Sequence, residues 1–184
     1  MSILIETEEQ KDYRKMFHDF AYGEVYPRAA EADEKEEFPF ELFDKMAEAG
    51  YTGMMTPVEY GGQGGGIWEL AAAAEEMAYY DSASALILVC QSLIPSGMLM
   101  AFGTKEQKEK YLPMLAQGIV NGKREISAMA MTEPGAGSDL RGIKTKAVLE
   151  GDHYVINGSK CFISNGAVAT VVFLFAQTEN GLST

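Results

Sequence analysis

The chain has 184 residues, 47% of them hydrophobic, and a formal net charge of −12. A chain of this length can bury one sizeable core or two small ones, so the composition indicates a globular protein. The acidic charge argues against a nucleic-acid partner, because phosphate binding rests on a density of Lys and Arg that this sequence lacks.

Neither membrane insertion nor export is expected. No uninterrupted apolar run reaches the roughly 18 positions that a membrane helix needs, and the N-terminal segment MSILIETEEQ lacks the basic start and apolar core of a secretory signal. The two cysteines, Cys90 and Cys161, lie far apart with no Cys or His at metal-ligand spacing. That distribution predicts neither a disulfide framework nor a metal site, and it favours a reducing compartment.

Helical periodicity begins near the N-terminus. Apolar residues recur at three- and four-residue spacing from Glu6 to about Ala32, which predicts an amphipathic helix. A short helix is predicted to open at Phe38-Pro39 and to stop at Gly50, with one side exposed. The glycine-rich stretch 57–66 is predicted to be a loop, because glycine loses the most backbone freedom on ordering.

Three further helices are predicted, at 67–80, from Ser82 to about Phe102, and from Thr104 to Gln117. The second of these is almost wholly apolar, so we expect it to be buried on all sides. Thr104 and Gln107 have the spacing of a capping box at the start of the third. Residues 1–124 are therefore predicted to form an all-α helical bundle domain.

Past Glu125 the apolar period changes from about 3.6 to 2, which is typical of strands. The strand candidates are 126–131, 144–150, 153–156, 160–164 and 168–177. Asn157-Gly158 and Asn165-Gly166 are predicted to supply the left-handed turns of tight hairpins. Residues 125–184 are therefore predicted to form an antiparallel β-barrel or sandwich domain that is incomplete in this chain, and the fold class is α+β.

A loop after the first strand has the composition of a ligand site. Pro134 fixes one backbone dihedral and Gly135 and Gly137 carry no side chain, so several N–H groups can approach one anion. Thr132 and Ser138 add hydroxyl groups. The alternative is an ordinary Pro-Gly turn without a ligand. The spacing does not match a Rossmann fingerprint, because the third glycine is missing.

The segment from Lys160 to Gly166 is the second candidate. As a strand it would place Phe162 and Ser164 on one side and Ile163 on the other. A ring beside a hydroxyl group suits a flavin, which needs an apolar plate and a hydrogen-bond donor. Taken alone, a core Phe and a surface Ser beside an Asn-Gly turn explain the segment better, so only the two segments together favour a cofactor site.

The ordered motifs of the second half resemble the acyl-CoA dehydrogenase family. They are TEPGAGSD at 132–139, GIKTKA at 142–147, YVINGSK at 154–160 and FISNG at 162–166, and the resemblance extends upstream through 57–62 and 105–113. The family often has Trp at the position of Phe162 and Thr at that of Ser164. Both replacements keep a ring and a hydroxyl group.

The resemblance implies FAD as the cofactor and assigns its contacts. Backbone N–H groups of Met129, Ala130, Met131 and Thr132 would line the pyrimidine side, Gly137 and Ser138 would meet the pyrophosphate, and Phe162, Ile163 and Ser164 would cover the other flank. Ser164 would bond the hydride-accepting nitrogen, and Ser138 would also touch the CoA portion of the substrate.

The resemblance also implies an activity, the dehydrogenation of an acyl-CoA to the trans-2-enoyl-CoA in fatty acid β-oxidation. It further implies an electron-transfer flavoprotein as acceptor, a homotetramer, and a bacterial cytoplasmic or, second, mitochondrial matrix location. The family's catalytic base lies in a C-terminal helical domain that we expect to be absent from this chain, which ends at Thr184. Glu133 is not assigned as the base, and a structural role in its turn is the preferred interpretation. The alternatives are a non-catalytic FAD- or acyl-CoA-binding module and a protein-association domain without cofactor.

Overall fold

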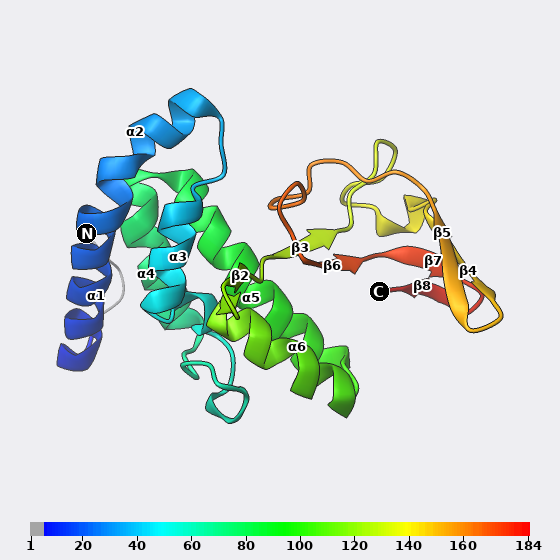
Figure 1. Ribbon diagram of the computed structural model, residues 1–184, viewed down its shortest axis with the longest axis horizontal. Coiled ribbons are helices and arrows are strands. Elements are labelled where there is room, and N and C mark those ends of the chain that lie inside the picture. Colours follow the sequence, from blue (N-terminus) through cyan, green and yellow to red (C-terminus); the bar gives the residue numbers. More distant parts are fainter. Residues whose placement is uncertain (1–5) are drawn as a thin grey trace. The chain divides into compact units, whose positions relative to one another are not determined.

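The computed structural model describes residues 6–184 in two compact units, the first ending at Glu125 and the second running from Ile126 to Thr184. The first unit is mainly helical, and the second contains strands β3 to β8 (Figure 1). The chain is therefore α+β, as predicted, with a helical unit followed by an incomplete β unit. Residues 1–5, part of the segment in which we expect no secretory signal, lie outside the described residues.

The first helical stretch comprises α1 (Glu8–Phe20), a π-helical segment (Ala21–Val25) and α2 (Tyr26–Lys35). It confirms the helix expected from Glu6 to about Ala32, with one turn of π-helix that the periodicity did not reveal. Phe17, Ala21 and Val25 are all buried. The wider π turn keeps these residues, spaced four apart, on one face of the stretch.

The short helix α3 (Phe40–Glu48) is confirmed, and its buried side is formed by Leu42, Phe43 and Met46. Gly50 follows it in the left-handed region, with φ of 80°. A side chain is disfavoured in that conformation, which explains why the helix stops where glycine stands.

The glycine-rich loop 57–66 is a loop, as predicted, with one short 3-10 turn at Val58–Tyr60. It folds back on the preceding segment, because Gly64 N donates to the Thr56 carbonyl at 2.9 Å and Gly65 N to the Met54 carbonyl at 2.8 Å. A Cβ at Gly62 would lie 2.1 Å from the Thr56 carbonyl oxygen. The glycine therefore permits a close backbone approach.

The bundle core is formed by α4 (Ile67–Tyr80), α5 (Ser82–Phe102) and α6 (Lys105–Gln117). Helix α5 packs against both α4 and α6, and α1 packs against α4. Asp81 caps α5 by accepting from the N–H groups of Ala83 and Ser84. The capping box predicted for Thr104 and Gln107 is confirmed at the start of α6.

Helix α5 is the apolar helix expected from Ser82 to about Phe102. Within residues 6–184 it is the one helix that is long and apolar enough to cross a membrane by length and composition, with 21 residues and a mean hydropathy of 1.9 in an 18-residue window, although Gln91, Ser92 and Ser96 interrupt its apolar run. Half of that apolar window is buried, which is typical of a core helix. The expected all-round burial is wrong towards its ends, where Leu86 is 50% and Phe102 77% exposed.

A hairpin that the sequence reasoning missed closes the first unit. Strands β1 (Ile119–Val120) and β2 (Lys123–Arg124) pair antiparallel around Asn121 and Gly122, whose φ values are 51° and 76°. Two positive φ values in a two-residue loop are typical of a type I′ turn. The Asn-Gly signal was therefore present at this position, although it was sought only further along the chain.

The second unit contains six short strands in two sheets. These are β3 (Ser127–Ala130), β4 (Lys146–Glu150), β5 (His153–Asn157), β6 (Val171–Leu174), β7 (Ala176–Thr178) and β8 (Gly181–Ser183). In one sheet β3 pairs with β6, and the other has the order β5-β4-β7-β8. Val148, Leu149, Tyr154 and Ile156 on β4 and β5 are about half exposed. The β unit is thus incomplete, as expected.

The prediction that the strands of the second unit pair antiparallel is wrong in part. The β4–β5 and β7–β8 pairs are antiparallel, but β3 pairs with β6 and β4 with β7 in parallel. The long segment between β5 and β6 returns the chain to the start of β3, which makes parallel pairing possible. The hairpin turn between β4 and β5 uses Gly151, with φ of 68°, and not Asn157-Gly158.

Two leucines of α5 differ in burial, so their substitution by alanine should lower the free energy of unfolding by different amounts. Leu88→Ala should lower the free energy of unfolding by about 2–5 kcal/mol, because a fully buried side chain leaves a cavity. The matched control Leu86→Ala, half exposed on the same helix, should cost less than about 1 kcal/mol. Urea unfolding followed by far-ultraviolet circular dichroism measures both, and equal losses would contradict the core position of α5.

Candidate functional site

The two segments predicted to bind the flavin lie side by side in the second unit. Cys161 N donates to the Thr132 carbonyl at 3.0 Å, and Lys160 Nζ donates to the Met131 carbonyl at 2.9 Å. Further along, Asn165 Nδ2 donates to the Ser127 carbonyl at 3.1 Å. The structure thus brings together residues that are about thirty positions apart in the chain.

The segment 160–164 is not a strand, contrary to prediction. Its backbone bonds to the end of β3 at Cys161 only and then turns, with Phe162 at φ of 56°. Phe162 and Ser164 therefore do not share one face of a strand, contrary to prediction. Gly166 N closes the turn on the Ile163 carbonyl at 2.9 Å, and Ile163 and Ser164 are half-buried.

Phe162 is unusual in both conformation and exposure. A non-glycine residue with positive φ is uncommon, and such strain costs about 1–3 kcal/mol. The residue is 93% exposed, so packing within the unit does not offset this strain. Strained residues that present a large apolar surface are concentrated at ligand sites. This geometry supports Phe162 as a contact residue, although the reasoning that first selected it was wrong.

The loop after β3 turns at Pro134-Gly135. Glu133 N donates to the Ala136 carbonyl at 2.9 Å, and Ala136 N donates to the Glu133 carbonyl at 3.1 Å. A Cβ added at Gly135 or Gly137 would meet no atom within 4 Å. The glycines are therefore not required by the packing of the unit itself, and the open space beside them allows a ligand to approach the backbone.

Alternate residues of β3 direct their backbone groups toward β6 and away from it. Phe175 N donates to the Ala130 carbonyl at 3.0 Å, so Ala130 faces β6 and the backbone groups of Met129, one residue earlier, face the other edge. The carbonyls of Met131 and Thr132 accept from Lys160 and Cys161. Among residues 6–184 the N–H of Thr132 has no acceptor, and it is available to a ligand.

Glu133 is the buried centre of this region. Its carboxylate accepts from Thr145 Oγ1 at 2.5 Å, Lys144 N at 2.7 Å, Thr145 N at 2.9 Å and Lys160 Nζ at 3.0 Å. The hydrogen bond from the Thr145 hydroxyl, followed by that from the Lys144 amide, lowers the pKa of Glu133 from 4.5 to about 2 against the opposing effect of burial. The structural role preferred for this residue fits these contacts.

The sequence reasoning missed Thr145 and Lys160 as partners of Glu133. Thr145 lies in the motif at 142–147 and Lys160 in that at 154–160, but nothing in the spacing of the motifs indicated that both side chains contact Glu133. Gly158 belongs to the same arrangement, since a Cβ there would lie 2.2 Å from Thr145 Oγ1. Its glycine permits close packing on Thr145 and does not form the left-handed turn that we predicted.

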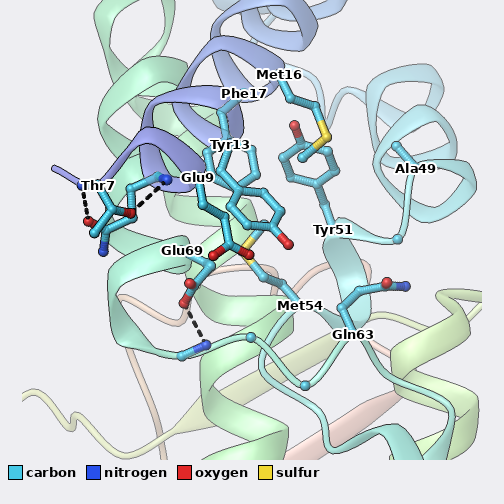
Figure 2. A pocket seen from close by; sticks show the side chains of 15 residues that line it. Thr7, Glu9, Tyr13, Met16, Phe17, Ala49, Tyr51, Met54, Gln63 and Glu69 are labelled. Atoms are coloured by element: carbon cyan, nitrogen blue, oxygen red, sulfur yellow. Dashed lines mark hydrogen bonds between the residues drawn. The ribbon is translucent and has the colours of Figure 1, made fainter.

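A separate pocket of about 680 Å³ lies within the helical unit (Figure 2). Its wall includes the side chains of Tyr13, Met16 and Tyr51, and the carboxylates of Glu9 and Glu69 lie at its edge. None of the nine residues predicted to contact the flavin lines this pocket. In the described part of the chain, no group of three or more His, Cys, Asp or Glu side chains could hold a metal ion.

Comparisons with known proteins identify the family. The family model for the N-terminal domain of acyl-CoA dehydrogenase matches residues 7–119, and that for the middle domain matches residues 128–184. The chain therefore belongs to the acyl-CoA dehydrogenase family, as its motifs indicated.

Similar proteins extend well beyond this chain. The short-chain specific acyl-CoA dehydrogenase of Clostridium acetobutylicum is 44% identical over 94% of this chain and 44% of its own length. A structure of acyl-CoA dehydrogenase complexed with FAD from Bacillus anthracis has a TM-score of 0.86 and 36% identity, over 100% of this chain and 32% of its own. A structure described as the electron transferring flavoprotein of Acidaminococcus fermentans has a TM-score of 0.87 and 36% identity, over 100% and 48%. The chain thus spans less than half the length of each.

The depressed pKa of Glu133 predicts a pH dependence of stability. Because the folded pKa is about 2 against an ordinary 4.5, the contribution of Glu133 is complete above the ordinary value and is lost as the pH falls towards 2. Glu133→Gln removes this ionisation, so the free energy of unfolding should fall less steeply from about pH 5 to pH 3 than in the parent chain. Urea unfolding across that range measures both slopes, and equal slopes would contradict the assigned contacts.

Proposed function

We propose that the chain is the N-terminal portion of an FAD-dependent acyl-CoA dehydrogenase, an oxidoreductase that converts an acyl-CoA thioester to the trans-2-enoyl-CoA. The observation that carries this proposal is the pairing of Cys161 N with the Thr132 carbonyl, because it brings the two candidate flavin segments together. Family membership supports the cofactor, and the similar Bacillus anthracis protein is complexed with FAD.

The residues present fit a flavin. The N–H of Met129 is directed away from β6, and the N–H of Thr132 has no acceptor among residues 6–184, so both donors can stabilise negative charge on the pyrimidine side. The space beside Gly137 admits the pyrophosphate to the backbone, with the exposed Ser138 hydroxyl next to it. The exposed ring of Phe162 offers the apolar plate, and Ser164 the hydroxyl group.

The proposed reaction removes two hydrogens from the acyl chain. A carboxylate base takes the α-proton of the thioester, and FAD, when bound, accepts the β-hydride. Glu133 does not suit the role of base, because four donors occupy its carboxylate and its pKa is about 2. No carboxylate of this chain is assigned that role, and we propose that the base lies in the remainder of the protein.

The wider setting follows from the family. We propose an electron-transfer flavoprotein as the acceptor of the electrons, a homotetramer for the whole protein, and a place in fatty acid β-oxidation in a bacterial cytoplasm. The resemblance to the Acidaminococcus fermentans structure supports the choice of acceptor.

Two assays separate the proposal from its alternatives. The purified chain, mixed with FAD and desalted, should retain a yellow chromophore, and retention of none would leave only the association domain. Mixing the chain with the separately produced remainder of the protein should then restore acyl-CoA-dependent dye reduction. Bound FAD without restored turnover would favour the non-catalytic module.

A substitution at Gly137 tests the proposed contact with the pyrophosphate of FAD. Gly137→Ala should leave the cofactor-free fold intact, because the added methyl group meets no atom within 4 Å, but it should weaken FAD binding by roughly tenfold or more through contact with the pyrophosphate. The matched control is Gly23→Ala, which also adds a methyl group to open space. Fluorescence titration with FAD measures the affinities, and equal affinities for the variant and the control would contradict the pyrophosphate assignment.

A further inference from the structure

The ammonium group of Lys160 is held in one place by two acceptors. It donates to the Met131 carbonyl at 2.9 Å and to Glu133 Oε1 at 3.0 Å, and the Lys160 side chain is 10% exposed. An ammonium group at such a site loses most of its hydration, so its position is fixed by its hydrogen bonds.

Glu133 in turn cannot follow Lys160 if that side chain moves. Its two oxygens are bonded to the backbone N–H groups of Lys144 and Thr145 and to the Thr145 hydroxyl. These donors lie at the entry to β4, where the Gln177 N–H donates to the Thr145 carbonyl at 2.8 Å. The ammonium group of Lys160 is therefore anchored through Glu133 to the sheet that contains β4.

The hydrogen bond from Lys160 to the Met131 carbonyl changes the polarity of the peptide group between Met131 and Thr132. The Met131 carbonyl and the Thr132 N–H belong to one peptide group, and a cation that binds the carbonyl oxygen polarises that group. The N–H at its other end becomes a stronger donor, by about 10–30%. It is this N–H that is available to a ligand beside the flavin segments.

We propose that Lys160 is a positioning residue that raises the reduction potential of the flavin through the Met131–Thr132 peptide, with Glu133 and Thr145 holding its ammonium group in place. The inference rests on the proposed function, because it requires FAD beside Thr132. A stronger donor at the pyrimidine side stabilises the charge that reduction places there, so the reduced cofactor is bound more tightly than the oxidised one.

An ion pair kept for stability alone would have a different signature. Replacing a buried pair by apolar groups of similar volume is often neutral in stability, and Cys161 N already joins the two segments through the Thr132 carbonyl. A purely structural Lys160 would change the melting temperature and the FAD affinity. It would not change the ratio of affinities for reduced and oxidised cofactor.

The test compares Lys160→Met with Lys146→Met in the full chain. Lys146 is an exposed residue of β4, so its substitution removes the same charge without touching the network. In Lys160→Met the preference for reduced over oxidised FAD should fall by roughly tenfold, which for a two-electron couple is a midpoint potential lower by about 30 mV. Lys146→Met should keep the parent potential.

If Lys160→Met does not fold, a second variant and a measurement on the cofactor-free chain test the same role of Lys160. Thr145→Val leaves both charges but removes one anchor of Glu133, and it should lower the potential by a smaller amount. In the cofactor-free chain, the amide proton resonance of Thr132 should move upfield in Lys160→Met and stay in place in Lys146→Met.

The outcomes are distinguishable. A parent chain that binds no FAD would overturn the proposed function and this inference with it. A parent and variants that bind FAD with equal midpoint potentials, or a Thr132 resonance that does not respond to Lys160, would overturn the inference alone. Lower potentials in the order Thr145→Val, then Lys160→Met, would support it.

Discussion

The buried carboxylate of Glu133 is the interaction on which the second unit depends. It accepts hydrogen bonds from the entry to β4 through Lys144 and Thr145, and from the start of the segment between β5 and β6 through Lys160. No strand pairing links these two places to the loop at Pro134, and the sheet that contains β3 has only two strands. A charged group that is buried needs such partners, because an unpaired carboxylate would be costly to desolvate. The network therefore fixes the loop that carries the candidate cofactor contacts.

Glycine has two distinct roles around that carboxylate. At Gly158 it lets the chain pass against Thr145, where a side chain would collide with the hydroxyl group. At Gly135 and Gly137 the backbone is exposed and unobstructed, so the absence of side chains leaves room that the unit does not fill. Packing explains the first role, and the cofactor that we propose would account for the second. The strained and exposed Phe162 belongs with the second group, since nothing in the described unit covers its ring.

The sequence predicted the helices well because their signals are local. The capping box at Thr104 and the helix stop at Gly50 depend on neighbouring residues alone. Strand pairing is non-local, so the parallel β3–β6 and β4–β7 pairs could not be read from periodicity. The segment 160–164 was predicted as a strand from its alternating apolar residues, but hydrogen bonds to the end of β3 and the turn at Phe162 decide its course. The motifs identified the candidate residues. The contacts of Glu133 with Thr145 and Lys160 could be identified only from the structure.

The central claim is that the segments 132–138 and 162–164 form one wall of a flavin site. Its most direct measurement is a nuclear magnetic resonance titration of the isotopically labelled chain with FAD, read residue by residue. We expect the amide resonances of residues 129–138 other than Pro134, and those of residues 162–164, to shift together with a single affinity, while those around the helical pocket near Tyr51 do not. Shifts confined to that pocket, or to one of the two segments, would contradict it.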